Sequence, residues 1–497
     1  MGMFIFETHL KKVKHDVLKN IAILAKNNKL TIEELGKIHE CIVDKDKPKY
    51  RCCIYKERAI VSQRAKLAAG YLPSGENIDH LIDIKNDDQI IYVIEAACDK
   101  CPINKYTVTG ACRGCIAHKC MEVCPTKAMV RVGGKAYINQ ELCKECGLCK
   151  KQCPYEAISE VLRPCKIVCP TGALTVAEDR QAMIKNEDCI QCGSCMTACP
   201  FGAISDKSLI EPVARRISHG EKMYAIVAPA IAGQFGPKVS MGQIRTALQN
   251  IGFIEMYEAA CGADVVTSHE SKEFVHRIKN GDKYMTNSCC PGFLNYIEKK
   301  FPTEAEHISS TVSPMIATGR YIKSLDSEAK IVFIGPCTAK KSEIRREPLK
   351  DVIDYVLTFE ELSALLDAFD MDPEKCEDSS VDDASIYGRG FAAAGGLTAA
   401  IENYIKSENI DIKFEPVQVS GPMNIKKAMS LAKVGRLQGN FIEGMMCEGG
   451  CIGGAGTILP PLATKATFKK QNNQATRKSV IENEKIAAFE SLNLERL

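Results

Sequence analysis

The stretch NSCCPGF, at Asn287–Phe293, places two adjacent cysteines in a turn that contains proline and glycine. A disulfide between sequence neighbours is strained and stabilises little, so the partners of these sulfurs lie elsewhere in the chain. Two later segments offer them, GPCTAKKSE at Gly335–Glu343 and MMCEGGCIGG at Met445–Gly454. Together the three segments supply the four thiolates that a cubane iron–sulfur cluster needs, and they leave one cysteine over.

Composition favours a metalloprotein. The 497 residues are 45% hydrophobic, enough for roughly two to four domains, and they include 26 cysteines. The start, Met1–His9, soon turns polar and basic and is unlike a secretory signal, so a disulfide-rich secreted protein is disfavoured and a cytoplasmic protein is expected. The net charge of +3 predicts no nucleic-acid partner. The chain lacks an apolar run of about 18 residues, which predicts no membrane-spanning helix.

Residues 1–95 are predicted to form a small, mostly helical domain. Apolar residues recur at helical spacing over Leu10–Ala25, Thr31 precedes a second helix, and Gln89–Ile94 has the pattern of a closing strand. This part has no metal-binding spacing. Its cysteines are interpreted as buried free thiols that pack as small hydrophobes, with cluster ligation by one of them as the alternative. They are Cys41, Cys52 and Cys53.

Residues 96–205 are organised by cysteine and are predicted to form a ferredoxin-like domain. CxxCxxCxxxCP runs span residues 143–154 and 189–200, a run with a longer middle spacing spans 112–125, and half a run spans 165–170. In such runs three sulfurs bind one cluster and the fourth binds the neighbouring cluster. By this rule Cys199 would be the fourth ligand of the cluster bound by Cys143, Cys146 and Cys149, if their partner run is the one that begins at residue 189. The pairing could instead involve the run at 112.

The cysteine count predicts three to four accessory clusters. The three full runs supply twelve cysteines, the half run adds two, and Cys98 and Cys101 bring the total to sixteen. We expect Cys98, Cys101, Cys165 and Cys169 to complete a fourth cluster, by themselves or by exchange, with a zinc site as the alternative. The predicted accessory ligands are Cys98, Cys101, Cys112, Cys115, Cys120, Cys124, Cys143, Cys146, Cys149, Cys153, Cys165, Cys169, Cys189, Cys192, Cys195 and Cys199.

From residue 220 to 497 the pattern alternates between strands and helices, which indicates α/β layers with a mostly parallel sheet. A helix is expected around Ile244–Ile251, and the basic segment from Lys465 is expected to form a solvated helix. The first two cysteine segments follow strand candidates, which is where open α/β sheets place their sites. The strand candidates are Met223–Val227, Ala263–Thr267, Lys283–Thr286, Lys330–Ile334 and Phe414–Val419.

In this order the three cysteine segments resemble the signature loops of the FeFe (iron-only) hydrogenases, which read Thr-Ser-Cys-Cys-Pro, Met-Pro-Cys-x-x-Lys-x-x-Glu and Met-x-Cys-x-x-Gly-Cys. The resemblance covers about residues 220–460. It implies a catalytic domain of two parallel-sheet α/β lobes, preceded by an α+β ferredoxin-like domain with several [4Fe–4S] clusters. It also implies an enzyme that interconverts protons, electrons and H2, exchanges electrons with a ferredoxin-like carrier, and depends on maturation proteins.

The resemblance implies a set of ligands for the family's H-cluster. Cys290, Cys337, Cys447 and Cys451 match the cysteines that hold its cubane. The Cys451 sulfur would bridge to a diiron subsite that carries CO, cyanide and an azadithiolate. The matching cofactor contacts are Lys340 at one cyanide, Ala228, Pro229 and Ala230 at the other, and Pro336 and Met445.

The resemblance also implies a proton path. Cys289, the remaining cysteine, matches a residue that passes protons to and from the cofactor, which suits a thiol because its pKa lies within reach of neutrality. Onward positions are Glu270, Glu273 and Ser309. A spacing of three puts the two carboxylates on one helical face. Between Glu270 and Cys289 the chain is one residue shorter than the common form.

Four departures from the family pattern predict a divergent, group B-like subgroup, because residues around a metal site tune its properties. They are Asn287, Met315, Gly335 and Met446. Two alternatives to the enzyme are a hydrogen sensor and a cluster-bearing scaffold without diiron, as in eukaryotic relatives involved in iron–sulfur assembly. A sensor should carry an output module, and a scaffold should have lost motif residues. Since every motif cysteine is present, the enzyme is favoured.

Overall fold

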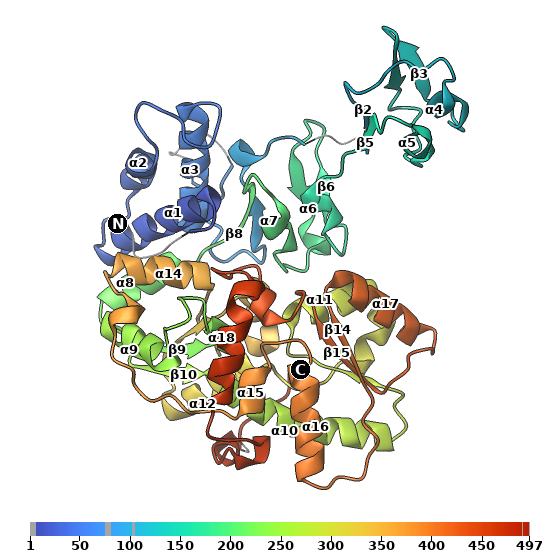
Figure 1. Cartoon of the computed structure of the whole chain (residues 1–497). Helices are drawn as coiled ribbons and strands as arrows, with labels where there is room; N and C mark the ends of the chain where they lie inside the picture. The colour runs from blue at the N-terminus through green and yellow to red at the C-terminus, as the bar shows by residue number, and fades with distance from the viewer. Residues whose placement is uncertain (1–5, 75–80, 102–104, 490, 497) are drawn as a thin grey trace.

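The computed structural model describes residues 6–74, 81–101, 105–489 and 491–496. Figure 1 shows an α/β region that follows residue 207, with the N-terminal helices and a cysteine-rich region packed along one side of it. None of the helices in these ranges is both long enough and apolar enough to cross a bilayer.

Two parallel sheets organise the α/β region. One has the order β10-β9-β12-β13 and the other has the order β11-β15-β14. All of their strand pairs are parallel, which confirms the predicted architecture of two parallel-sheet lobes. The strands are β9 (Met223–Val227), β10 (Glu255–Glu258), β11 (Met285–Thr286), β12 (Lys330–Ile334), β13 (Tyr355–Leu357), β14 (Pro416–Ser420) and β15 (Phe441–Met445).

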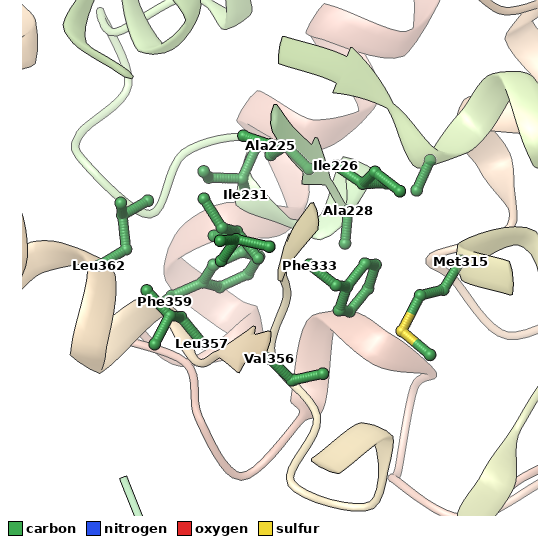
Figure 2. Packing of buried hydrophobic residues seen from close by; sticks show 14 of the residues in the cluster. Ala225, Ile226, Ala228, Ile231, Met315, Phe333, Val356, Leu357, Phe359 and Leu362 are labelled. Atoms are coloured by element: carbon green, nitrogen blue, oxygen red, sulfur yellow. The ribbon is translucent and has the colours of Figure 1, made fainter. Parts of the chain in front are cut away.

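Buried apolar side chains cover both faces of the four-stranded sheet. In Figure 2, Leu357 of β13 lies beside Phe359 and Leu362 of helix α14 on one face of the sheet. Ile226 of β9 is in register with Phe333 of β12 and is buried on the opposite face. Strands buried on both faces have near-continuous apolar sequences instead of alternating ones. This explains why the run over Lys330–Ile334 predicted β12 with its exact bounds.

Helices fill the connections between the strands. Two of them begin at capping boxes, α9 at Ser240 with Gln243 and α14 at Thr358 with Glu361, in which side chains satisfy the free N–H groups of the first turn. The helices are α8 (Ile210–Ser218), α9 (Met241–Ile251), α10 (Ala259–Lys279), α11 (Pro291–Lys300), α12 (Pro314–Leu325), α13 (Lys340–Glu343), α14 (Phe359–Ala368), α15 (Ile386–Gly390), α16 (Gly396–Ser407), α17 (Pro422–Lys433), α18 (Pro461–Asn473) and α19 (Ile486–Phe489).

Several strand predictions were wrong in part. Ala263–Thr267 lies inside α10, which packs against α12, α15 and α16 and is buried on nearly every side of its first half. A short apolar run in such a helix cannot be told from a strand by its periodicity. Of Lys283–Thr286 the last two residues form β11, and the strand predicted at Phe414–Val419 begins at Pro416. No strand was predicted at β10, β13 or β15.

The cysteine-rich region consists of two units with the same plan, one inserted in the other. We call residues 105–161 the inner module and residues 90–101 with 162–207 the outer module. Each has a pair of strands that joins its two ends, a hairpin and two short helices. The inner module contains β2 (Tyr106–Val108), β3 (Met129–Val132), β4 (Lys135–Ile138), β5 (Ile158–Glu160), α4 (Lys119–Glu122) and α5 (Leu148–Gln152). The outer module contains β1 (Ile91–Val93), β6 (Leu174–Val176), β7 (Ala182–Ile184), β8 (Ile204–Asp206), α6 (Pro164–Ile167) and α7 (Ser194–Ala198).

The N-terminal part contains the helices α1 (His9–Lys26), α2 (Ile32–Ile42) and α3 (Ile54–Ala68). Helix α1 packs against α8 and α14 of the α/β region as well as against α3. The strand predicted at Gln89–Ile94 contains β1, which pairs with β8 of the outer module. The interpretation of this part's cysteines as buried thiols was wrong, because Cys41 and Cys52 are exposed and Cys53 is half-buried.

Candidate active site and cluster-binding cysteines

The three cysteine segments meet in one cavity between the two sheets. Each segment leaves the carboxyl end of a parallel strand, the first after β11, the second after β12 and the third after β15. A fourth loop, at the end of β9, reaches the same place. The cavity has a volume of about 90 Å³, and the side chains around it include Ala228, Pro229, Cys289, Cys290, Pro336, Cys337, Lys340, Met445 and Cys451.

Two glycines allow the third segment to approach its neighbours. A Cβ added to Gly450, whose φ is 95°, would lie 2.6 Å from the backbone nitrogen of Ala394. A Cβ added to Gly454 would lie 2.4 Å from the carbonyl oxygen of Pro336, in the segment that carries Cys337. A larger residue at either position would push the third segment away. These glycines therefore serve backbone-to-backbone contact between the segments that form the cavity.

The four candidate cubane ligands are close enough to act on one another electrostatically. Burial raises the pKa of the Cys337 thiol to about 12, and the neighbouring Cys290 and Cys451 add to the shift. Burial likewise raises the pKa of Cys447 well above its ordinary value, with Cys337 as the next cause. Thiolates grouped in this way are costly unless a cation balances them, and soft thiolate ligands suit iron. The donor set therefore fits a cubane cluster.

The predicted cofactor contacts are placed around this cavity with one exception. Ala230 is buried but does not reach the cavity wall. Lys340 is 8% exposed, and its Nζ lies 2.6 Å from a carboxylate oxygen of Glu343 and 3.4 Å from the carbonyl oxygen of Cys289. Burial alone would lower the pKa of Lys340, but the Glu343 carboxylate outweighs it and the pKa is raised. The cavity wall thus carries a charged ammonium group.

Asn287, noted in the sequence only as a departure, contacts the sulfur of Cys289. The N–H of Gly444 donates to Asn287 Oδ1 at 2.7 Å, and Asn287 Nδ2 donates to the Gly444 carbonyl at 3.3 Å. The backbone N–H can only donate, so it fixes which end of the amide is oxygen. Nδ2 also donates to Cys289 Sγ at 3.2 Å. The Asn287 side chain therefore fastens the first segment to β15 and orients the thiol of Cys289.

The four residues of the predicted proton path lie together. Burial raises the pKa of Cys289 well above its ordinary value, and the carboxylate of Glu270 is the next cause. Glu270 is completely buried, and the polar groups nearest to it, the Ser309 hydroxyl and the Ser288 backbone, form no well-aligned hydrogen bond to its oxygens. Burial and then the charge of Glu273 raise the pKa of Glu270 to about 8. Ser309 donates to Glu273 at 2.6 Å, and Arg277 pairs with Glu273 at 2.9 Å.

Sequence reasoning missed the part of the cavity wall formed by α10. Ala259, Ala260 and Ala263 face the cavity from the first turns of this helix, where a strand had been predicted for residues 263–267. Small residues at helical spacing, AAxGA over 259–263, were the signal that could have found it. Phe333, Phe391 and Met315 complete the apolar wall.

The sixteen accessory cysteines form four groups, each with cysteines from two or three segments. Four cysteines, which we call tetrad I, surround one cavity of the inner module, and four others, which we call tetrad II, surround another. In the outer module, burial raises the pKa of Cys165 to about 11, and Cys199 and Cys101 add to the shift. Burial raises the pKa of Cys189 to about 11 as well, and Cys192 and Cys169 add to it. The groups are tetrad I, with Cys112, Cys115, Cys120 and Cys153; tetrad II, with Cys124, Cys143, Cys146 and Cys149; tetrad III, with Cys98, Cys101, Cys165 and Cys199; and tetrad IV, with Cys169, Cys189, Cys192 and Cys195.

This grouping decides between the pairings that the sequence left open. The sulfurs at 143, 146 and 149 lie with Cys124 instead of Cys199. The half run takes part by exchange, because Cys165 joins Cys199 whereas Cys169 joins the run at 189. Each module thus exchanges the fourth cysteine of its runs internally, as in two-cluster ferredoxins.

Tetrad IV lies against the candidate active site. Thr338, next to Cys337, donates from its hydroxyl to the carbonyl oxygen of Gln191 at 2.8 Å. Cys192 is among the charges that act on Cys447, and both residues line a cavity at this junction. The loop of tetrad IV is therefore in direct contact with the segment that carries Cys337.

A buried ion pair holds the outer module in place. Lys341 is 1% exposed, and its Nζ donates to Asp206 at 2.7 Å and to Glu361 at 2.9 Å. These partners belong to the end of β8 and to α14, while Lys341 itself is four residues beyond Cys337. Removing one member of such a pair leaves an uncompensated charge, at a cost of about 3–5 kcal/mol. The pair therefore keeps the cysteine-rich region in register with the cavity.

Replacement of Cys165 by serine tests whether tetrad III holds a cubane. We expect iron to fall by about four atoms per chain, because a [4Fe–4S] cluster loses one of its four thiolates. Metal analysis of anaerobically purified protein measures this, and Cys41→Ser, at an exposed cysteine outside the tetrads, is the matched control. Unchanged iron together with one equivalent of zinc in the wild type would contradict the assignment.

The fold and the grouped cysteines define an iron–sulfur protein of parallel α/β architecture. The comparisons with known proteins agree. Residues 221–455 match the family model of the iron only hydrogenase large subunit, C-terminal domain. Residues 136–159 match a 4Fe-4S binding domain and residues 159–210 match the LdpA Fe-S cluster-binding domain.

Proteins of similar sequence show to which family this iron–sulfur protein belongs. Iron hydrogenase 1 of Clostridium pasteurianum is 30% identical over 56% of this chain and 57% of its own length. The periplasmic [Fe] hydrogenase large subunit of Nitratidesulfovibrio vulgaris is 30% identical over 51% of this chain and 73% of its own length. The cytosolic Fe-S cluster assembly factor NAR1 of Kluyveromyces lactis is 31% identical over 22% of this chain and 24% of its own length. The chain belongs to the iron-only hydrogenase family, and it spans little more than half the length of the first of these relatives.

Proposed function

We propose that the protein is an FeFe hydrogenase, which interconverts two protons and two electrons with H2. The observation that carries the proposal is that Cys289 and three of the candidate cubane ligands line one cavity, and that the same ligands act electrostatically on the fourth, Cys447. A protein that had lost hydrogen chemistry would have no reason to keep in this cavity a half-buried thiol that is not needed as a ligand.

In this proposal the chain's residues hold the H-cluster at the ends of the parallel strands. Cys290, Cys337, Cys447 and Cys451 would hold its cubane, and Cys451 would also help to hold the diiron subsite. When bound, that subsite, with its CO, cyanide and azadithiolate ligands, supplies the redox chemistry on hydrogen. The charged Lys340 and the backbone around Ala228 and Pro229 would contact the polar ligands of the subsite, and Pro336 and Met445 would exclude water from it.

Protons travel along residues of the chain. The Cys289 thiol would hold and pass a proton at its sulfur, between the cofactor cavity on one side and the Glu270 carboxyl on the other. Glu270, whose pKa is about 8, is protonated at neutral pH and can both donate and accept. Ser309 and Glu273 continue the path toward the surface, since Ser309 already donates to Glu273.

Electrons travel through the cysteine-rich region. Tetrads I to IV bind [4Fe–4S] clusters, whose chemistry is one-electron transfer. The contact between tetrad IV and the Cys337 segment is the point of entry to the active site, through the Thr338–Gln191 hydrogen bond and the Cys192–Cys447 junction. A ferredoxin-like carrier supplies or removes the electrons. Maturation proteins and the cytoplasmic location remain predictions.

An infrared spectrum of anaerobically purified, diiron-reconstituted protein, paired with an H2-evolution assay that uses a reduced dye, tests the proposal. We expect CO and cyanide bands together with H2 production. Bands without turnover would contradict catalysis and favour a sensor. A known hydrogenase reconstituted in parallel controls for the maturation step.

A second function, in iron–sulfur cluster assembly, is favoured by one observation. This is the similarity to the assembly factor of Kluyveromyces lactis over about a fifth of the chain. The same experiment separates the two functions. Cubane iron with neither infrared bands nor turnover, beside an active control hydrogenase, would favour assembly.

A further inference from the structure

The surface around tetrad I combines an exposed apolar residue with a group of cations. Figure 1 shows the inner module extending away from the α/β region, with β3 and α4 at its far end. Tetrad I lies at that end, because Cys120 belongs to α4 and Cys112 accepts from the backbone N–H of Ala136 in β4. Its cavity opens to the surface there. We call this surface the tetrad I face.

An isoleucine stands out from this face. Ile116 directly follows the candidate ligand Cys115 and is 95% exposed. It lies in the four-residue spacing between Cys115 and Cys120, which is longer than the two-residue spacing of the standard runs. Tyr155, two residues after Cys153, is 53% exposed on the same cavity. Large apolar side chains held out next to a cluster ligand favour contact with another protein.

Four cations surround the same cavity, and no acidic side chain is found among the described residues that line it. The cations are Arg113, Lys119, Arg131 and Lys135. The loop and the hairpin that carry them touch, since a Cβ added to Gly114 would lie 2.1 Å from the carbonyl oxygen of Gly134 and 4.0 Å from the Arg131 guanidinium. The positive charges are therefore concentrated in one place.

These cations form no ion pair among the residues that the structure describes, and Lys135 makes only a 3.4 Å hydrogen bond to the carbonyl oxygen of Gly110. The ion pairs of the inner module join Glu160 to Lys105 and to Lys150, at the strand pair that connects the two modules. None of the four cations of the tetrad I face takes part. Grouped like charges repel one another, and a surface rich in carboxylates would relieve this and be steered toward the face.

We propose that the tetrad I face is the docking surface for a small, acidic iron–sulfur electron carrier of the ferredoxin type. Carboxylates of the carrier pair with the four cations, and an apolar patch beside the carrier's cluster covers Ile116 and excludes water. The exchange is one electron between the carrier and the cluster of tetrad I, with no bond made or broken. The inference rests on the proposed electron path and adds where that path begins.

The test measures binding of an acidic two-cluster bacterial ferredoxin to the cluster-loaded protein by calorimetry at low salt. For the double variant Arg131→Glu/Lys135→Glu we expect the Kd to rise by tenfold or more, because two attractive contacts become repulsive. Ile116→Ser should raise it by a few-fold with no loss of folding, since the side chain is exposed. Binding of the wild type should weaken steeply as salt is added.

Lys427→Glu/Lys433→Glu is the matched control, because it reverses two exposed charges on α17 of the α/β region. Iron content shows that the clusters are loaded in every variant. A Kd that changes equally in both double variants, or in neither, would overturn the docking surface. So would binding of phosphatidylserine vesicles that depends on Arg131 and Lys135 while ferredoxin binding does not, since that result assigns the face to a lipid surface.

The outcome is independent of the proposed enzyme activity. Ferredoxin binding is measured without turnover, whereas H2 evolution from a reduced small dye needs no docking. Dye-linked turnover with unaltered ferredoxin binding in the variant would refute only the docking surface. Absence of dye-linked turnover with variant-sensitive binding would refute only the hydrogenase and leave the docking surface standing.

Discussion

Replacing Cys289 with alanine is expected to reduce H2 turnover on the order of a thousandfold while the metal content stays unchanged. The thiol lies in the cavity beside the candidate ligand Cys290 and next to Glu270, where it can transfer a proton without being needed to bind metal. A positioned group that transfers protons contributes roughly 10²–10⁴ in rate. Dye-linked H2 evolution, iron analysis and the infrared bands together measure the effect.

The control for this experiment is another cysteine outside every group of candidate ligands. Cys376 is half-buried in the loop that follows α14, and Cys376→Ala should leave turnover unchanged. Loss of iron or of the infrared bands in the Cys289 variant would show that this sulfur is a ligand. Turnover near that of the wild type would remove Cys289 from the proton path.

Replacing Glu270 with glutamine is expected to lower turnover and raise stability at the same time. The amide cannot exchange a proton, so we expect turnover to fall on the order of a hundredfold. The carboxyl is completely buried and lacks a well-aligned hydrogen bond, and burial outweighs the nearby Ser309 and Ser288, so ionisation is costly in the native state. The same property that suits Glu270 to a proton path therefore reduces the stability of the fold.

The stability effect has a defined pH dependence. The pKa of Glu270 is raised from 4.5 to about 8 in the native state. Between these values the unfolded state releases a proton that the native state keeps, so this group's contribution to stability is fully present below pH 4.5 and is lost as the pH rises toward 8. Glu270→Gln should abolish this loss and be more stable than the wild type at pH 8 by a few kcal/mol.

Denaturant unfolding of the anaerobic protein at pH 5 and pH 8 measures the difference. Glu306→Gln, at a 78% exposed carboxylate, is the matched control and should leave the pH dependence unaltered. Equal slopes of stability with pH in the wild type and in Glu270→Gln would contradict a buried, protonated Glu270.

Local sequence patterns were enough to predict a helix or a strand wherever one physical effect dominates a segment. The continuous apolar run over Lys330–Ile334 predicts a strand covered on both faces, and β12 has those bounds. The residues at Thr31 and Leu10–Ala25 predicted the cap of α2 and most of α1, because capping and helical periodicity are local. At Ala263–Thr267 the same reasoning failed. Other helices surround this part of α10, so its apolar residues are not confined to one face of the helix and show no helical periodicity.

The contacts around the cavity are a second case in which local patterns were insufficient. Asn287 differs from the family pattern, and the sequence indicated only that it lies near the cofactor. In the fold its amide is held by Gly444, more than 150 residues further along the chain, and is thereby aimed at the Cys289 sulfur. A hydrogen bond between residues so far apart depends on the pairing of β11 with β15, and β15 was not predicted at all.

Residue types and their spacing were sufficient to establish how many thiolates the chain has and which three segments carry the ligands of the candidate active site. Spacing does this because sulfurs two or three residues apart in one loop must face the same cluster. The fourth sulfur of each tetrad could be assigned only from the folded chain. The inner module is inserted between Cys101 and Cys165, so these two cysteines meet although they are more than sixty residues apart, whereas Cys165 and Cys169, close in sequence, belong to different tetrads.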